Sequence, residues 1–211
     1  DHIKNESKKA EKSPAYQNTF RRLFLNQWTA QTERWIDMVR WNESAGEVYE
    51  EDLLNELCYC GLDLSVRIDL TAFVMVFPDE EGYYDIIAKF WMPEEEILTR
   101  TRRDNVPYES WVQKGWIKAI PGATVDLDEV LDDIAVYSNK FNLASIAYDR
   151  WGASHISKRI ENELGIDMEQ FGQGYASMSE PSKSLIATMA EKKLRHGNNP
   201  VLNWNAESVS V

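Results

Sequence analysis

Two aspartates in this chain of 211 residues stand beside apolar segments in a way that suits metal chemistry. Asp63 lies inside the apolar run 57–64, and Asp149 directly follows the nearly all-apolar stretch 143–148. A carboxylate within a buried strand is costly unless a cation pairs with it. Clustered carboxylate oxygens suit hard cations such as Mg²⁺ or Mn²⁺. We therefore expect Asp63 and Asp149 to share one metal site, provided that their strands are neighbours.

Asp69 stands at the start of the second apolar run 70–77 and is a further oxygen donor for the same site. Two hard cations about 4 Å apart activate a water and stabilise the leaving oxygen in phosphodiester hydrolysis. The residues alone leave a structural alternative open, because an aspartate at a strand end is more often a helix cap or a turn residue. That alternative applies to Asp149 and Asp69 more than to Asp63, which the sequence places mid-strand.

Apolar runs and turn residues predict the elements that would position these aspartates. Two apolar, β-branched runs joined by a short turn indicate a β-hairpin, and a third strand follows the turn at 78–82. The expected strands are 57–64, 70–77, 83–91, 143–148 and 166–171. The expected helices start at Pro93 and Pro107 and then span 125–141, with Asp126 as a candidate cap, 153–164 and 182–195, and a Gly/Ser-rich loop is expected at 172–181. This order predicts an α/β protein with an RNase H-like fold: a mixed sheet in which an antiparallel three-strand meander is followed by βα units, with helices on both faces.

The N-terminal part of the chain carries a different pattern. Residues 1–15 are rich in Lys and Glu and indicate a frayed or solvated helix end, while the spacing of apolar residues after Ala15 predicts an amphipathic helix. A second short amphipathic segment is expected around Trp28, Trp35 and Trp41, whose rings are best explained by packing. The acidic stretch 43–56 is expected to be a linker or exposed turn.

The net charge of −12 argues against a simple basic surface for nucleic acid. Basic residues nevertheless gather in three places, at 100–103, 150–159 and 183–195, which permits a local basic groove on an acidic protein. Cys58 and Cys60 are two residues apart in a predicted strand and lack a second cysteine pair or a nearby His. We therefore expect buried, reduced thiols rather than a zinc site.

Other chemistries find no support in the sequence. It contains no P-loop motif, no dinucleotide fingerprint after Gly172 and no G-x-S-x-G elbow. The basic residues each have a structural alternative: Arg100 and Arg103 fit a solvated helix end, and His196 fits a surface or structural role. Contact with nucleic acid is the competing interpretation for all three.

Several strings together resemble one protein family, the nuclease domain of tailed-bacteriophage terminase large subunits. They are G-L-D-L-S with D-L-T-A-F-V, V-P-Y-E-S-W-V followed by I-P-G, A-Y-D-R-W-G-A, F-G-Q-G-Y-A-S-M-S-E-P and H-G-N-N-P-V-L-N-W. The N-terminal F-R-R-L-F-L-N-Q-W-T resembles the segment that joins this domain to the family's packaging ATPase. The resemblance thus implies a helical linker over 1–50 and an RNase H-like nuclease domain over 51–211.

The family implies a metal-dependent endonuclease that cuts concatemeric double-stranded viral DNA during genome packaging, with two Mg²⁺ or Mn²⁺ ions. Asp63 and Asp149 match its catalytic metal-binding carboxylates, and Asp69 matches a nearby acid that assists. The family pattern adds a catalytic Asp on a C-terminal helix, which we expect beyond Val211. The candidate DNA-binding residues are Arg100, Arg103, Arg150, Lys183 and His196.

The same resemblance implies the terminase small subunit and the portal as partners, an oligomer only in the assembled motor, and no membrane. It places the protein in the host cytoplasm and transiently at the procapsid portal. Two other classes stay open: a non-catalytic docking module of the motor, which would bind no metal, and a fragment of an actin-like or sugar-kinase-like ATPase, which would bind nucleotide.

Overall fold

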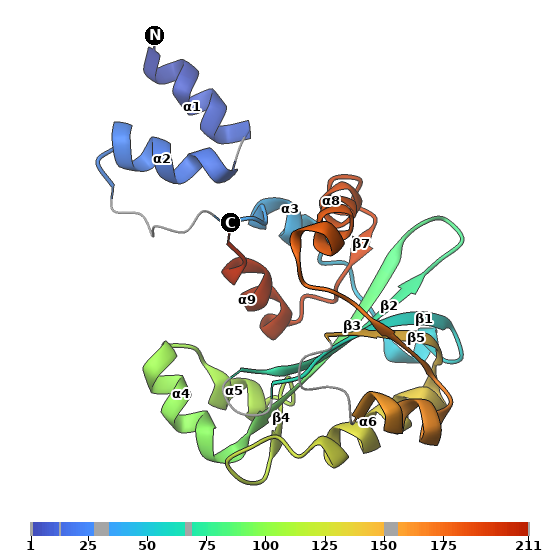
Figure 1. The fold of residues 1–211 in the computed structure, drawn as a ribbon. Coiled ribbons are helices and arrows are strands. Elements are labelled where there is room, and N and C mark those ends of the chain that lie inside the picture. The colour runs from blue at the N-terminus through green and yellow to red at the C-terminus, as the bar shows by residue number, and fades with distance from the viewer. Residues whose placement is uncertain (1, 13, 28–33, 66–68, 150–155, 211) are drawn as a thin grey trace.

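The computed structural model describes residues 2–12, 14–27, 34–65, 69–149 and 156–210. In these ranges the chain forms a mixed sheet of seven strands, ordered β4-β3-β2-β1-β5-β6, with β7 also paired to β3 (Figure 1). The strands are β1 (Leu57–Asp63), β2 (Thr71–Pro78), β3 (Tyr84–Pro93), β4 (Lys118–Ile120), β5 (Asn142–Tyr148), β6 (Asp167–Gln170) and β7 (Leu194–Arg195).

The first three strands form the predicted antiparallel meander, since β2 is antiparallel to both β1 and β3. Strand β5 is parallel to β1, and β6 is parallel to β5, as expected for strands joined by helical crossovers. The apolar sequence of β5 follows from this position between β1 and β6 in the sheet. A mixed sheet in which an antiparallel meander is extended by parallel strands agrees with the RNase H-like fold that the sequence predicts.

The helical elements of the described residues are α1 (His2–Lys12), α2 (Pro14–Phe24), α3 (Met38–Glu43), η1 (Glu50–Leu53), η2 (Glu94–Glu96), α4 (Ile97–Asp104), α5 (Tyr108–Gln113), α6 (Leu127–Lys140), the π-helical turn η3 (Ile160–Leu164), α8 (Tyr175–Ala190) and α9 (Pro200–Ser208). Local signals explain several of their ends. Asp126 caps α6 by accepting from the Asp128 backbone N–H, as its sequence position predicts. Gly165 follows η3 with φ of 68°, a left-handed conformation that glycine adopts easily.

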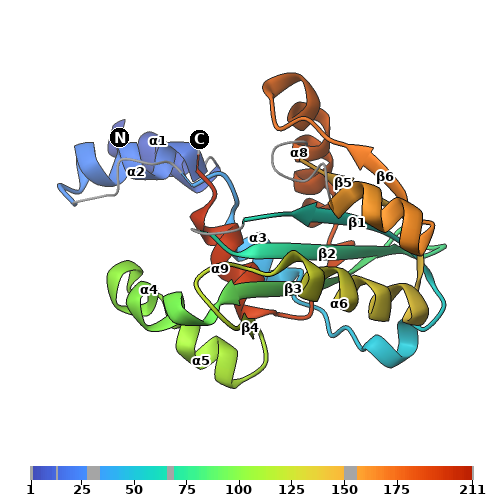
Figure 2. The same cartoon turned by 60° about the horizontal axis from the view of Figure 1, so that its bottom comes forward.

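Both faces of the sheet are covered (Figure 2). Alternate side chains of β2, such as Phe73 and Met75, pack with those of α6, such as Val130 and Ile134. The opposite face of the sheet packs on α4, α5 and α9, where Tyr108 is fully buried. Cys58 and Cys60 are buried and free in the first of these cores, as predicted.

The C-terminal part of the chain differs from the prediction. The predicted loop 172–181 is wrong from Tyr175 onward, because α8 starts there and continues through Pro181 to Ala190. Proline removes one helical hydrogen bond, but the later turns of α8 bury Met189 in a third apolar cluster and thereby stabilise the helix. The expected helix over 182–195 therefore ends early, and residues 194–195 form β7 instead. Strand β4 and helix α9 were not predicted.

Residues 2–12 and 14–24 form two helices, α1 and α2, that pack on each other and lie outside the layers covering the sheet (Figure 1). The rings of Phe20 and Phe24 stack at 5.3 Å, and Tyr16 donates a hydrogen bond to the carboxylate of Glu6. Of the two expectations for residues 1–15, a frayed or a solvated helix end, the described part agrees with the helical one. No described helix is long and apolar enough to cross a membrane.

The segment 34–48 packs on the C-terminal helices. The Trp35 backbone N–H donates to the Val209 carbonyl at 3.0 Å, and Trp41 is 3% exposed in the apolar cluster that contains Met189. Farther along, Glu50 forms ion pairs with Lys89 and Lys140. Contacts therefore cross residue 50, although the division into a linker and a nuclease domain stays a prediction. Trp28 lies outside the described residues.

Candidate metal centre

The parallel pairing of β1 and β5 brings Asp63 and Asp149 to one edge of the sheet. Leu62 is aligned with Tyr148, so the next residue of each chain segment, Asp63 and Asp149, lies at the carboxyl end of its strand. The expected position of Asp63 in the middle of a strand is wrong: β1 ends at Asp63, and its side chain is exposed. Leu64 extended the apolar run in the sequence by one residue beyond the strand.

The electrostatics of this edge disfavour the ionised form of Asp63. The pKa of Asp63 is raised above its ordinary value, first by partial burial of the carboxyl group and then by the negative charges of Asp149 and Asp69. A raised pKa means that the ionised form of Asp63 is disfavoured in the folded protein. Because the residue is exposed, water screens much of this repulsion. A divalent cation bound at this edge would offset the repulsion that remains.

The loop between β1 and β2 is closed by side-chain hydrogen bonds. The Thr71 hydroxyl donates to the Ser65 carbonyl at 2.9 Å and accepts from the Ser65 backbone N–H at 3.2 Å. The Ser65 hydroxyl in turn accepts from the Asp69 backbone N–H at 2.9 Å. Thr71 is fully buried, so this clip fixes both ends of the loop next to Asp63. This clip was not predicted, although polar residues flanking a hairpin turn are its signal in the sequence.

The oxygen donors at this edge suit a divalent cation and would supply part of its ligands. Among the described residues, no group of three or more His, Cys, Asp or Glu is placed to hold a metal ion. The structure thus brings Asp63 and Asp149 together and does not add Asp69 as a third ligand. Mg²⁺ is commonly held by only one or two carboxylates, with water and substrate phosphate completing its octahedron. The hard, anionic oxygens of Asp63 and Asp149 meet that requirement.

Two candidate DNA-binding residues lie in the interior. Arg100 is 4% exposed and His196 is 1% exposed. The His196 Nε2–H donates to the Trp41 carbonyl at 2.8 Å, and its ring stacks on the Trp41 indole with centroids 4.2 Å apart. Burial lowers the pKa of His196 and so favours the neutral imidazole. In this conformation neither side chain is presented to a DNA phosphate, so neither is a candidate for DNA contact.

The other three candidates differ in their surroundings. Arg103 is exposed and donates to Asp104 at 2.6 Å. Lys183 is exposed on α8 and is paired with Glu180 at 2.7 Å. Arg150 lies outside the described residues. Exposed ion pairs of this kind are weak in water, so Arg103 and Lys183 stay available to a phosphate.

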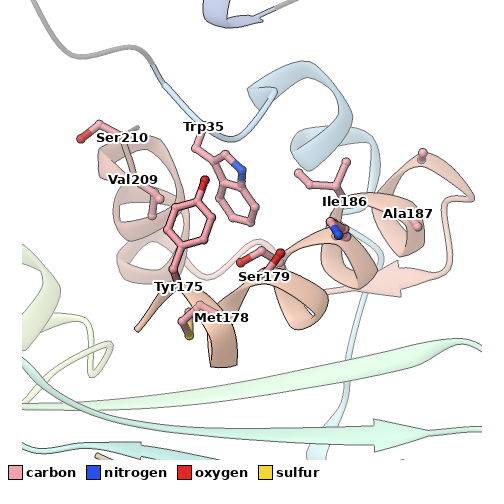
Figure 3. A pocket seen from close by; sticks show the side chains of 11 residues that line it. Trp35, Tyr175, Met178, Ser179, Ile186, Ala187, Val209 and Ser210 are labelled. Atoms are coloured by element: carbon pink, nitrogen blue, oxygen red, sulfur yellow. The ribbon is translucent and has the colours of Figure 1, made fainter. Parts of the chain in front are cut away.

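A separate apolar groove of about 640 Å³ runs along α8, between Trp35 and the residues that follow α9 (Figure 3). Tyr175, Met178 and Val209 lie around it (Figure 3), and Lys183 is among its lining residues. Neither Asp63 nor Asp149 is among its described lining residues. It is therefore distinct from the acidic edge of the sheet.

Comparison with known proteins agrees with this architecture. The chain matches, over residues 1–211, the family model described as terminase large subunit, endonuclease domain. It is 36% identical over 207 residues to the terminase large subunit of Enterobacteria phage HK97, covering 98% of this chain and 40% of that protein. It is 22% identical to Protein YmfN of Escherichia coli K12, covering 95% of this chain and 46% of that protein. The chain thus spans less than half the length of these relatives.

Two solved structures have the same fold. The crystal structure of the HK97 large terminase matches with a TM-score of 0.75 and 34% identity, over 96% of this chain and 42% of that one. The magnesium-bound large terminase nuclease of thermophilic phage G20c matches with a TM-score of 0.54 and 10% identity, over 86% of this chain and 82% of that one. The sheet order and these matches define an RNase H-like domain. The chain belongs to the family of terminase large subunit endonuclease domains.

Proposed function

We propose that this chain is a metal-dependent endodeoxyribonuclease that cleaves concatemeric double-stranded viral DNA during genome packaging, by two-metal-ion hydrolysis of the phosphodiester bond. One observation carries the proposal: the parallel register of β1 and β5 sets Asp63 beside Asp149 at the carboxyl edge of the sheet. Family membership and the magnesium in the G20c nuclease support it. The packaging ATPase would lie outside these residues.

The protein's contribution to the reaction would be mainly to position charge. Asp63 and Asp149 would hold the ions, together with a further carboxylate beyond Val211. When bound, Mg²⁺ or Mn²⁺ supplies Lewis acidity toward a water and toward the leaving oxygen. No side chain then has to act as a nucleophile. The clip formed by Ser65 and Thr71 would keep Asp63 at the end of its strand while DNA binds.

Binding of DNA would rest on phosphate contacts, which carry no sequence information. Exposed Arg103 and Lys183 are the described candidates, and Arg150 is a further one by its position next to Asp149. The body of the protein is acidic, so we expect this binding to be weak and to fall steeply with salt. The small subunit and the portal are proposed partners, in the host cytoplasm and at the procapsid.

Plasmid nicking in Mg²⁺ or Mn²⁺ tests the proposal, using a chain that extends beyond Val211. Asp63→Asn and Asp149→Asn should each lower the nicking rate by about 100-fold or more, because even outer partners of metal ligands are worth about 10–100-fold. Asp167→Asn is the matched control, since Asp167 is an exposed aspartate at the amino end of its parallel strand. Undiminished cleavage by Asp63→Asn would overturn the assignment. Absence of Mn²⁺ binding by the parent protein would favour a docking module instead.

A further inference from the structure

A buried arginine lies close to the loop that follows Asp63. Arg100 is on α4, and only 5% of its side chain is exposed. Its Nε donates to Asp104 at 3.3 Å, its Nη2 donates to the Tyr108 hydroxyl at 3.3 Å, and its guanidinium lies 5.0 Å from the centre of the Tyr108 ring. Its Nη1 is buried without a hydrogen-bond partner among the described residues.

Burying a guanidinium with one nitrogen unsatisfied is unfavourable, because a desolvated donor without a partner carries the full cost of its lost hydration. Packing of α4 against α5 does not require a charge at this position, since a buried apolar side chain would fill the space. Asp104 on the same helix already accepts from its Nε, and Arg100 also reaches a second acidic group outside the helices. That group is Asp69, whose Oδ1 lies 3.9 Å from Arg100 Nη2.

Asp69 is the exposed partner of this ion pair, since 80% of its side chain is accessible to solvent. Its backbone is held by the Ser65 hydroxyl, and the clip between Ser65 and Thr71 connects it to the end of β1. The negative charge of Asp69 acts on Asp63, two residues before Ser65. Arg100 therefore contacts an acidic residue of this loop whose charge also acts on Asp63.

We propose that Arg100 is a positioning residue for the metal centre: it acts through Asp69 and holds this carboxylate where it assists the binding of a divalent cation at Asp63 and Asp149. The inference rests on the proposed function. It replaces the expectation that Arg100 contacts DNA. It also assigns Asp69 a place outside the direct ligands, in agreement with the absence of a three-ligand group among the described residues.

The proposal predicts the sign of a measurable effect. If Arg100 were only a nearby positive charge, its removal would reduce repulsion and tighten the binding of a cation. If it positions Asp69, its removal weakens binding, and the effect disappears once Asp69 has lost its charge. A double-mutant cycle between the two residues separates these cases.

The experiment measures binding of Mn²⁺ alone by titration calorimetry to the parent protein and to variants Arg100→Gln, Asp69→Asn and the double variant. We expect each single variant to weaken binding by about 10-fold and the double variant to be no weaker than either. Arg102→Gln, on the same helix, removes an exposed arginine for which no ion pair is described and should leave the affinity unchanged. Arg100→Lys keeps the charge without the planar fork and should restore only part of the affinity.

Hydrogen exchange of the Asp69 backbone amide gives a readout that needs no metal. Its N–H is bonded to Ser65, so loosening of the loop in Arg100→Gln should speed its exchange by about 10-fold, and Arg102→Gln should not. Asp69→Asn is a surface change, so the cycle retains an informative arm even if Arg100→Gln unfolds. Tighter or unchanged Mn²⁺ binding in Arg100→Gln, or additive effects in the double variant, would overturn the positioning role. No binding by the parent protein would instead remove the metal centre itself and, with it, this inference.

Discussion

Trp41→Ala provides a sharp test of how the N-terminal segment is joined to the nuclease fold. The Trp41 side chain is 3% exposed, stacks on His196 with an interplanar angle of 16°, and donates from Nε1 to the Asn203 side chain at 2.8 Å. All of these contacts join residues before position 50 to the C-terminal part of the chain. The substitution removes them and leaves a cavity.

The magnitude follows from the buried area. A buried Trp removes about 150–250 Å² from water, which corresponds to roughly 4–6 kcal/mol at about 25 cal/mol per Å² and somewhat less after correction for a compact unfolded state. Measured Trp-to-Ala changes in cores cost about 3–5 kcal/mol. We therefore expect a loss of about 3–5 kcal/mol in the free energy of unfolding. At about 2–4 °C per kcal/mol, Tm should fall by roughly 6–20 °C.

Urea unfolding followed by circular dichroism, together with thermal melts, measures this loss. Val39→Ala is the matched control, because Val39 is on the same helix α3 and is 69% exposed, so its loss should change stability by less than about 0.5 kcal/mol. A Trp41→Ala protein within about 1 kcal/mol of its parent would refute the reasoning. Such a result would mean that residues 34–48 are attached only loosely, as a linker would be.

Two further predictions concern titrating groups. Burial lowers the pKa of His196 from 6.5, so the stability due to its neutral form is complete above that value and is lost as the pH falls below it. Chemical denaturation between about pH 7.5 and 5 should show a shallower loss in His196→Gln than in the parent, and parallel profiles would contradict a buried neutral imidazole. The pKa of Asp63 is raised, so its ionised form costs stability at neutral pH and this cost vanishes as the pH falls through that pKa. In metal-free buffer at pH near 7, Asp63→Asn should raise the free energy of unfolding by less than about 1 kcal/mol, whereas a clear loss of stability would show that the carboxylate is already compensated.

The sequence predicts the parts of the fold that local patterns determine. Apolar runs located β1, β2, β3 and β5, and Asp126 marked the start of α6. The placement of Asp63 and Asp149 at neighbouring strand ends was predicted because both residues border apolar segments. The end of β1 was misplaced, since Leu64 continues the apolar pattern while the chain already leaves the sheet.

Residues whose roles depend on distant partners were not predictable in this way. His196 is buried by Trp41, which is 155 residues away, and Arg100 reaches Asp69 in a different element. A basic residue near a helix end gives the same local pattern whether it is solvated or buried. The start of α8 was missed for a related reason: glycines and Pro181 favour a loop locally, while burial of residues such as Met189 stabilises the helix from outside.

The central claim is that Asp63 and Asp149 hold divalent cations at the carboxyl edge of the sheet. Crystals grown with Mn²⁺, and diffraction data collected at the manganese absorption edge, test it most directly. We expect an anomalous peak within about 2.0–2.3 Å of carboxylate oxygens from both residues, and its loss in Asp63→Asn. Anomalous peaks only at other positions, or no peak at this edge in the parent protein, would contradict the account.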